Sequence, residues 1–266
     1  MGYTLSGTTF KGVSFKGQKT IGSYVPDLWL DYRRNTIIED ADRVASIIDG
    51  GINGFFFPHN GGDNGRPFLT SDGIRPNHAN AAGGLLRPAS ANMKFLHDSS
   101  EYILIFVGSL AGSESTNARP LVTSSGSAVP GFALNFQPAN RTYQLVAGRS
   151  GGNYYSILSS TNLIPASGTF FFAVKFYGGT TGDNLKVYVN GTEYLHQVTS
   201  GSFSTADPTA FTAMKQGANT TNPLYSTKLV IAKNCAGLSD PQIDALLSEI
   251  IATIKLDPEY FSLITP

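Results

Sequence analysis

The pattern of apolar and polar residues is clearest in residues 168–194, where it predicts three strands joined by two turns. Residues 170–177 are apolar or aromatic except for Lys175, which is typical of a strand that is buried on both faces. The glycine-rich residues 178–184 predict a turn. In residues 185–191, LKVYVNG, apolar and polar positions alternate, and the final Asn-Gly pair is a strong hairpin signal.

Similar short patterns continue along most of the chain. They predict further strands at residues 26–31, 36–44, 47–51, 101–108, 132–136, 143–147, 154–158 and 225–232. The stretch from Pro67 to Arg87 carries mainly turn markers, and we expect it to be a loop. Short strands about 8–12 residues apart, separated by glycine and serine, favour a sandwich of two antiparallel sheets.

One helix is predicted, at about residues 240–255 near the C-terminus. Ser239 is a suitable N-cap with Gln242 three residues later, and Pro241 fits the first turn. One apolar stripe follows, formed by Ile243, Leu246, Leu247, Ile250, Ile251 and Ile254. This stripe should pack on the sandwich or on a partner.

Composition excludes several classes of partner. Lys plus Arg and Asp plus Glu number 19 each, and charged residues make up 14% of the 266 residues, against about 25% in ordinary domains. No basic cluster is longer than Arg33-Arg34, so we expect no binding to nucleic acid or to a membrane surface. No apolar run is long enough for membrane insertion. The single Cys235 cannot form an intrachain disulfide, and residues 1–12 do not resemble a secretory signal.

Residues 1–23 form a separate segment rich in Gly, Thr, Ser and Lys. It contains two copies of Phe-Lys-Gly, which begin at Phe10 and Phe15. Either this segment is an arm whose aromatic residues dock on a neighbouring subunit, or it is the first strand of the sandwich. Residues 24–266 then form the sandwich domain.

Three motifs, in this order along the chain, resemble LamG-like modules of the concanavalin A-like lectin and glucanase superfamily. The first is PDLWLD followed by IIDGGING and Arg66-Pro67, the second is VYVNG at residues 187–191, and the third is LSDPQI at residues 238–243. Many members carry a second tryptophan where this chain has Ile48. The resemblance implies an all-β, concanavalin A-like jelly-roll sandwich of two antiparallel sheets with one C-terminal helix.

The sequence contains little that predicts catalysis. None of the six glutamates is followed two residues later by an aspartate, and we interpret Asp40 and Asp42 as a solvated acidic edge, so no enzyme is expected. The four histidines lack the spacing of a zinc site, and no cofactor is expected. Calcium stays open, because oxygen ligands occur on the predicted loops at Asp63, Asn64, Asp72, Asp183 and Asn184. We interpret Trp29 as a core residue.

The resemblance, the low charge and the aromatic arm lead to two compatible hypotheses of function. The first is a structural or surface-binding subunit of a bacteriophage virion, such as a head decoration or fibre component. It would be assembled in the host cytoplasm, exposed on the particle, and bound to other virion subunits as a homo-oligomer. Its assembly candidates are Phe10 and Phe15 in the N-terminal segment. The second hypothesis is a carbohydrate-binding module or adhesin, with glycan candidates Tyr177, Asp183, Asn184 and Tyr188. A glycoside hydrolase is the third alternative.

Overall fold

The computed structural model describes most of the chain from Tyr24 to Leu256. The described residues are 24–32, 37–40, 43–60, 66–70, 73–76, 84–87, 90–110, 118–123, 130–137, 140–150, 153–158, 162–179, 184–194, 197–199, 202–208, 210–216 and 225–256. Phe10, Phe15 and Asp183 lie outside them, as does the whole segment 1–23. The alternatives for that segment therefore stay predictions.

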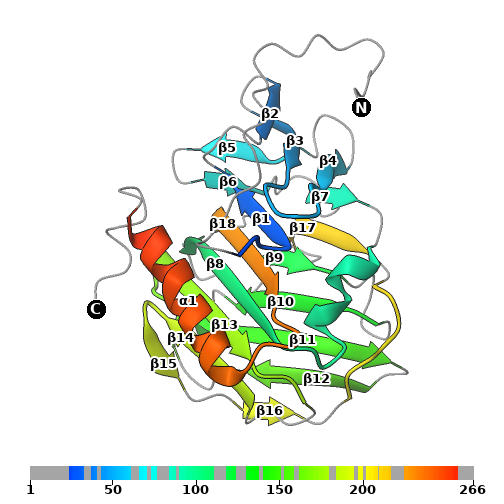
Figure 1. Ribbon diagram of the computed structural model, residues 1–266. Coiled ribbons are helices and arrows are strands. Elements are labelled where there is room, and N and C mark those ends of the chain that lie inside the picture. Colours follow the sequence, from blue (N-terminus) through cyan, green and yellow to red (C-terminus); the bar gives the residue numbers. More distant parts are fainter. Residues whose placement is uncertain are drawn as a thin grey trace.

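Most of the regular structure in the described chain consists of β-strands (Figure 1). Its elements are β1 (Leu28–Asp31), β2 (Ile37–Asp40), β3 (Arg43–Ile48), β4 (Phe56–Asn60), β5 (Phe68–Thr70), β6 (Gly73–Arg75), β7 (Gly84–Arg87), the 3-10 helix η2 (Ala91–Leu96), β8 (Tyr102–Leu110), β9 (Ala118–Val122), β10 (Phe132–Gln137), β11 (Thr142–Ser150), β12 (Asn153–Leu158), β13 (Thr169–Phe176), β14 (Leu185–Val189), β15 (Thr192–Tyr194), β16 (Gln197–Thr199), β17 (Phe211–Gln216), β18 (Tyr225–Asn234) and α1 (Asp240–Lys255).

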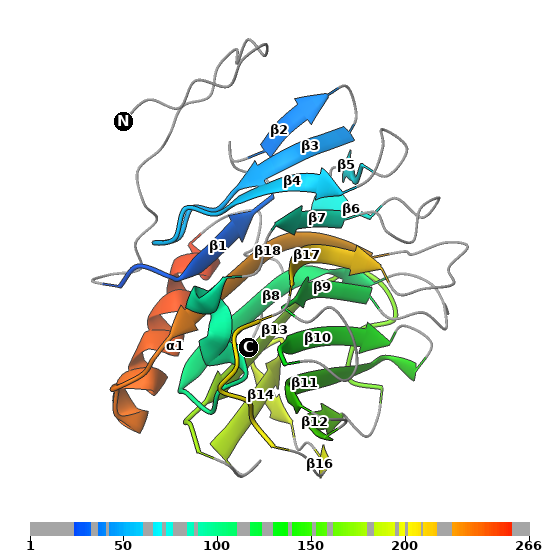
Figure 2. The same ribbon diagram turned by 90° about the vertical axis from the view of Figure 1, so that its right-hand side faces the viewer.

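The strands form two antiparallel sheets. The middle sheet runs β15-β14-β13-β8-β18, and β18 also pairs with β1 and β6, from which the sheet continues through β5 to β3 and β2. The outer sheet runs β16-β12-β11-β10-β9-β17-β7. Strand β4 pairs with both β3 and β7 and so joins the two sheets at one edge. Figure 2 shows three layers, with α1 on one side of the middle sheet and the outer sheet on the other.

Strand β13 shows why the central strands are apolar throughout. Phe170, Phe172, Val174 and Phe176 belong to the core between the sheets, whereas Phe171 and Ala173 belong to the core under α1. The prediction of burial on both faces is therefore confirmed. Across the first core, the ring of Phe136 on β10 lies 5.2 Å from the rings of both Phe170 and Phe172. Burial of each such ring contributes about 2–3 kcal/mol of hydrophobic free energy.

Helix α1 begins and packs as its sequence predicts. The side-chain oxygen of Gln242 accepts hydrogen bonds from the Ser239 backbone N–H (2.8 Å) and hydroxyl (2.9 Å). The apolar stripe covers the face of the middle sheet that carries Trp29, Ile103 and Ile231. Trp29 is 8% exposed, which confirms its assignment to the core. Among the described helices, none is long and apolar enough to cross a membrane.

The prediction of a loop from Pro67 to Arg87 is wrong, because β5, β6 and β7 lie within it. Gly73 explains how β6 reaches β18. A Cβ at Gly73 would lie 2.2 Å from the Thr227 carbonyl oxygen, and the backbone φ of +113° favours glycine. The glycine that indicates a turn in the sequence thus permits close strand packing. Strands β9 and β17 and the 3-10 helix η2 are further elements that the sequence pattern does not predict.

Candidate functional site

A group of polar and aromatic side chains lies on the middle sheet beside α1. In the register of β13 and β14, Lys175 faces Lys186 and Ala173 faces Tyr188, so these four residues share one face. This is the face covered by α1, because Ala173 packs in the core under the helix. Tyr177, just after β13, packs against the same core. The site is therefore built by strand alternation on a rigid sheet.

Lys175 is the centre of this group. Its ammonium lies 2.6 Å from Asp244 Oδ1 on α1, and its distances to the ring centroids of Tyr177 and Tyr188 are 5.2 and 5.4 Å. The Tyr177 hydroxyl donates to the same Asp244 oxygen at 2.5 Å. Burial alone would lower the pKa of Lys175, but the bonds to Asp244 and the two tyrosines outweigh it and raise that pKa. Lys175 is thus held as a cation between two aromatic rings.

Glu193 on β15 forms a second polar centre next to Tyr188. Its Oε1 lies 2.8 Å from the Lys186 ammonium, and its Oε2 accepts a hydrogen bond from the Tyr188 hydroxyl at 3.1 Å. The bond from Lys186 is the main cause that lowers the pKa of Glu193. We call the whole group, Lys175, Tyr177, Lys186, Tyr188, Glu193 and Asp244, the tyrosine–carboxylate cluster.

The cluster presents both donors and acceptors to solvent. The side chains of Asp244, Glu193 and Lys186 are 51%, 46% and 42% exposed, whereas that of Lys175 is 11% exposed. Tyr177 and Tyr188 are half-buried. The buried lysine therefore fixes the positions of aromatic and acidic groups that remain accessible.

Of the glycan candidates, the structure brings Tyr177 and Tyr188 together around Lys175. Asn184 has a local contact, because its side-chain amide donates to the Gly178 carbonyl at 2.7 Å and its own carbonyl accepts from Tyr177 N–H at 2.9 Å. It holds the turn after β13. Asp183 lies outside the described residues, so its role stays a prediction.

Sequence reasoning missed the charged members of the cluster. Lys175 carried a signal, since it is the one charged residue in an otherwise apolar strand. Asp244 carried none, because its contact with Lys175 joins residues 69 positions apart. Glu193 and Lys186 face each other diagonally across a hairpin, and that register could have suggested their ion pair.

The motif IIDGGING, in contrast, has a structural role. Asp49 is 4% exposed, and its carboxylate accepts hydrogen bonds from the backbone N–H groups of Trp29 (2.6 Å), Gly51 (2.7 Å) and Phe55 (3.3 Å). At Gly51 a Cβ would lie 2.8 Å from the Pro26 carbonyl oxygen. The aspartate and the glycine together dock this turn against β1.

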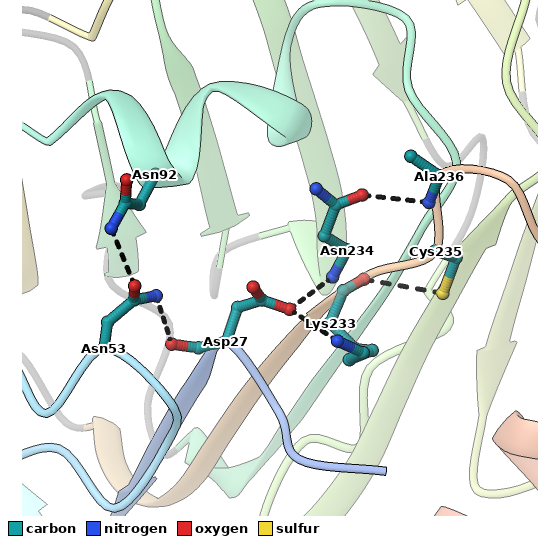
Figure 3. Close-up of polar contacts among 7 residues, drawn as sticks. All are labelled: Asp27, Asn53, Asn92, Lys233, Asn234, Cys235 and Ala236. Atoms are coloured by element: carbon teal, nitrogen blue, oxygen red, sulfur yellow. Dashed lines mark hydrogen bonds and ion pairs between the residues drawn. The ribbon is translucent and has the colours of Figure 1, made fainter.

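A second polar network, shown in Figure 3, joins β1 to the end of β18 and to η2. Asp27 Oδ2 accepts from Lys233 Nζ at 3.1 Å and from the Asn234 backbone N–H at 2.8 Å. The Asp27 carbonyl accepts from Asn53, which in turn accepts from Asn92 at 2.7 Å. Since these groups bind one another, the network fixes the relative positions of the three elements.

Candidate metal ligands do not gather in the described part of the chain. Within those residues, no group of three His, Cys, Asp or Glu side chains could hold a metal ion. Of the calcium candidates, Asp63, Asn64, Asp72 and Asp183 lie outside the description, so the possibility of calcium stays a prediction.

Comparison with known proteins identifies the fold but no family. No protein-family model matches the chain, and no curated protein sequence matches it. The solved structures that are similar at low identity include three binding domains. The receptor binding domain of botulinum neurotoxin D is 13% identical with a TM-score of 0.54, and the match covers 87% of this chain and 54% of that one. A second structure, the botulinum neurotoxin serotype D binding domain, is 13% identical with a TM-score of 0.52. The match covers 85% of this chain and 51% of that one.

The third is the binding domain of Paraclostridial Mosquitocidal Protein 1, which is 9% identical with a TM-score of 0.55. The match covers 85% of this chain and 52% of that one. The chain thus spans about half the length of these solved domains. At such identities the likeness establishes the fold alone. It agrees with the arrangement of strands: the chain is an all-β, jelly-roll-type sandwich of two antiparallel sheets with one C-terminal helix.

Proposed function

We propose that this chain is a carbohydrate-binding module whose site is the tyrosine–carboxylate cluster. The observation that carries the proposal is the position of Lys175, which holds two half-exposed tyrosine rings and an exposed carboxylate around one ammonium group. Sugars present apolar C–H faces and many hydroxyl groups. Tyrosine rings match the former, while carboxylates and ammonium groups match the latter.

The cluster is also rigid before any ligand arrives. Asp244 joins Lys175 and Tyr177 to α1, and Glu193 joins Tyr188 to Lys186 across the β14–β15 hairpin. Side chains that are already ordered lose little conformational entropy on binding. This preorganisation supports a binding role for the surface.

The electrostatics of the two carboxyl groups support binding over glycoside hydrolysis. Burial would raise the pKa of Asp244, but the bonds from Lys175 and Tyr177 outweigh it, and the pKa is lowered. The pKa of Glu193 is lowered as well. A glycosidase needs one carboxyl group that stays protonated near neutral pH as a general acid, which requires a raised pKa. Both carboxyl groups of the cluster are instead ionised.

The names of the similar structures support the same direction, since two are binding domains of botulinum neurotoxin D and the third is the binding domain of Paraclostridial Mosquitocidal Protein 1. A β-sandwich serves many functions, so this support concerns the general role, and the cluster itself carries the choice of ligand class.

A glycan array tests the proposal. We expect the full chain to bind a subset of glycans with dissociation constants between micromolar and millimolar. Tyr177→Ala and Tyr188→Ala should each weaken binding roughly tenfold or more, as loss of a stacked ring does. Tyr24→Ala is the matched control, because Tyr24 is also a half-buried tyrosine packed on the core under α1 but lies outside the cluster. An array without signal, or equal losses for all three variants, would rule the proposal out.

The finer hypothesis, a bacteriophage virion subunit with other virion proteins and copies of itself as partners, is a further proposal. It is supported by the LamG-like motifs, the low charge and the aromatic segment 1–23. It is compatible with glycan binding, because an exposed virion module could bind glycans on a host surface. Its test is the oligomeric state of the full chain.

A further inference from the structure

The two tyrosines of the tyrosine–carboxylate cluster offer hydrogen-bond acceptors to a ligand. The Tyr177 hydroxyl donates its proton to Asp244, and the Tyr188 hydroxyl donates its proton to Glu193. A phenol has one proton, so each hydroxyl has only its oxygen lone pairs left for another molecule. Both tyrosines therefore act as acceptors toward a bound sugar.

The two lysines of the cluster add little donor capacity. The Lys175 ammonium contacts Asp244 and both tyrosines, and its side chain is 11% exposed. Lys186 is more accessible, but it forms an ion pair with Glu193 at 2.8 Å. A group that approaches Lys186 therefore also meets a carboxylate.

Asp244 provides an acceptor that the cluster leaves open. Its Oδ1 binds both the Lys175 ammonium and the Tyr177 hydroxyl, whereas its Oδ2 has no hydrogen bond to any residue that the structure describes. The side chain is half-exposed, and its backbone lies within α1. A free oxygen on an ionised carboxylate in a fixed position can accept a charge-assisted hydrogen bond from a hydroxyl group.

We propose, on the basis of the function proposed above, that the cluster binds neutral sugars and excludes acidic ones, and that Asp244 Oδ2 accepts a hydrogen bond from a sugar hydroxyl. The hydroxyl groups of a neutral sugar can donate to Asp244 and Glu193 while its C–H face lies on a tyrosine ring. A site whose polar groups match a hydroxyl on the ligand rejects an analogue that leaves those groups unpaired.

Acidic sugars meet the opposite situation. The carboxylate of a uronic acid or the sulfate of a sulfated sugar brings only acceptors and negative charge. The cluster already carries two carboxylates, and its two ammonium groups are both paired with them. Like charges brought together and acceptors left without donors both weaken binding.

Matched pairs of glycans test this specificity. Each pair consists of a neutral oligosaccharide that ends in glucose or galactose and its counterpart in which the terminal CH2OH group is oxidised to a carboxylate. On an array of such pairs at neutral pH, we expect the full chain to bind the neutral members at least roughly tenfold more tightly. Equal or tighter binding of the acidic members would overturn this inference and leave glycan binding by the cluster intact. An array on which neither member of any pair binds would overturn both.

Asp244→Asn tests the role of Asp244, with titration calorimetry on the pair whose neutral member binds most tightly. The asparagine oxygen can still accept from Lys175 and Tyr177, while its NH2 group stands in place of Oδ2 and donates. The affinity for the neutral member should fall roughly tenfold, and that for the acidic member should stay unchanged or rise. A merely structural role would lower both affinities by the same factor, and that result would contradict the assignment of Oδ2.

Glu249→Gln is the matched control, because it removes a negative charge from the same helix outside the cluster. We expect it to leave both affinities unchanged to within about twofold, since a distant charge on the surface is screened by salt. Equal shifts of the neutral-to-acidic preference in Glu249→Gln and Asp244→Asn would show an effect of overall charge and would rule out Asp244 as the acceptor.

Discussion

At the scale of single residues, Asp49 and Lys175 show how two buried charged side chains acquire different roles. The Asp49 carboxylate accepts hydrogen bonds from backbone N–H groups and is buried, so almost none of its surface is accessible to a ligand. The Lys175 ammonium contacts side chains that remain about half-exposed, among them Asp244 and Tyr177. The first residue therefore stabilises a turn, whereas the second positions a surface.

Replacement of Asp49 tests its structural role. Asp49→Ala leaves the N–H groups of Trp29, Gly51 and Phe55 without their acceptor, and we expect a loss of about 3 kcal/mol or more in the free energy of unfolding. Urea unfolding followed by fluorescence measures this change. Asp98→Ala is the control, because Asp98 accepts one hydrogen bond, from Ser100 N–H, and should cost less than about 1 kcal/mol. Equal effects of the two changes would contradict the assigned role.

The same residues show how far a sequence can be interpreted. Asp49-Gly50-Gly51 is visible as a motif, because tight turns need such residue types. The three hydrogen bonds that the Asp49 carboxylate accepts reach as far as 20 residues along the chain, and they depend on how β1 lies beside the turn. Among the glycan candidates, alternation alone places Tyr188 on the face of Lys186. The carboxylate that orders Tyr177 comes from a helix whose position no local pattern reports.

At the scale of elements, the segment 202–208 is attached to η2 by several polar contacts. The Ser204 backbone N–H donates to the His97 carbonyl at 3.0 Å, and His97 Nε2 lies 2.9 Å from the Ala206 carbonyl oxygen. Lys94 and Asp207 form an ion pair at 3.5 Å. His97 is fully buried and its Nδ1 has no partner, so the arrangement suits a neutral imidazole that donates from Nε2.

This contact should make the stability of the protein depend on pH. Burial is the main cause that lowers the pKa of His97; Lys94 lowers it further, while Ala206, Asp98 and Asp207 oppose the change. A lowered folded-state pKa means that the unfolded chain binds the proton more readily. The contribution of His97 is therefore complete above pH about 6.5 and is lost as the pH falls from there through the lowered pKa.

We expect the free energy of unfolding to decrease between pH 7 and pH 5, and we expect His97→Gln, which retains a donor for Ala206, to decrease less. Urea unfolding at the two pH values measures both slopes. His59→Gln serves as the control for histidine content. An identical pH dependence in the natural chain and in His97→Gln would show that the contact does not couple to protonation.

Elements differ in how well the sequence predicts them. Strand β13 and helix α1 are long and periodic, because each must bury a continuous apolar face, and both were predicted correctly. Strands β5 and β6 have three residues each and contain Gly, Thr and Arg, so their identity depends on pairing with β3 and β18. Strand β9 includes Pro120 and is likewise ordered by its neighbours. The local sequence pattern therefore predicts a strand poorly where the strand forms only through its pairing with neighbouring strands.

At the scale of the whole molecule, the middle sheet separates the tyrosine–carboxylate cluster from the core between the sheets. Its face toward α1 carries the cluster, and its other face contributes Phe170, Phe172 and Tyr225 to that core. Because strand alternation assigns adjacent residues to opposite faces, one sheet can carry a polar surface site on one face and an apolar core on the other. Substitutions in the cluster should therefore leave the packing of the core between the sheets unchanged.

The oligomeric state is the property that tests the virion hypothesis for the whole chain. If residues 1–23 dock on a neighbouring subunit, light scattering should give a mass several times the 28.3 kDa of one chain, and removal of these residues should return it to that of a monomer. The double variant Phe10→Ser with Phe15→Ser should act in the same direction, because it removes the aromatic groups while the length is kept. If the segment is instead a first strand, removal should lower the thermal stability without a change of mass. A monomer in every case would contradict the docking role and the proposed virion assembly, while glycan binding by the cluster would remain to be judged by its own array.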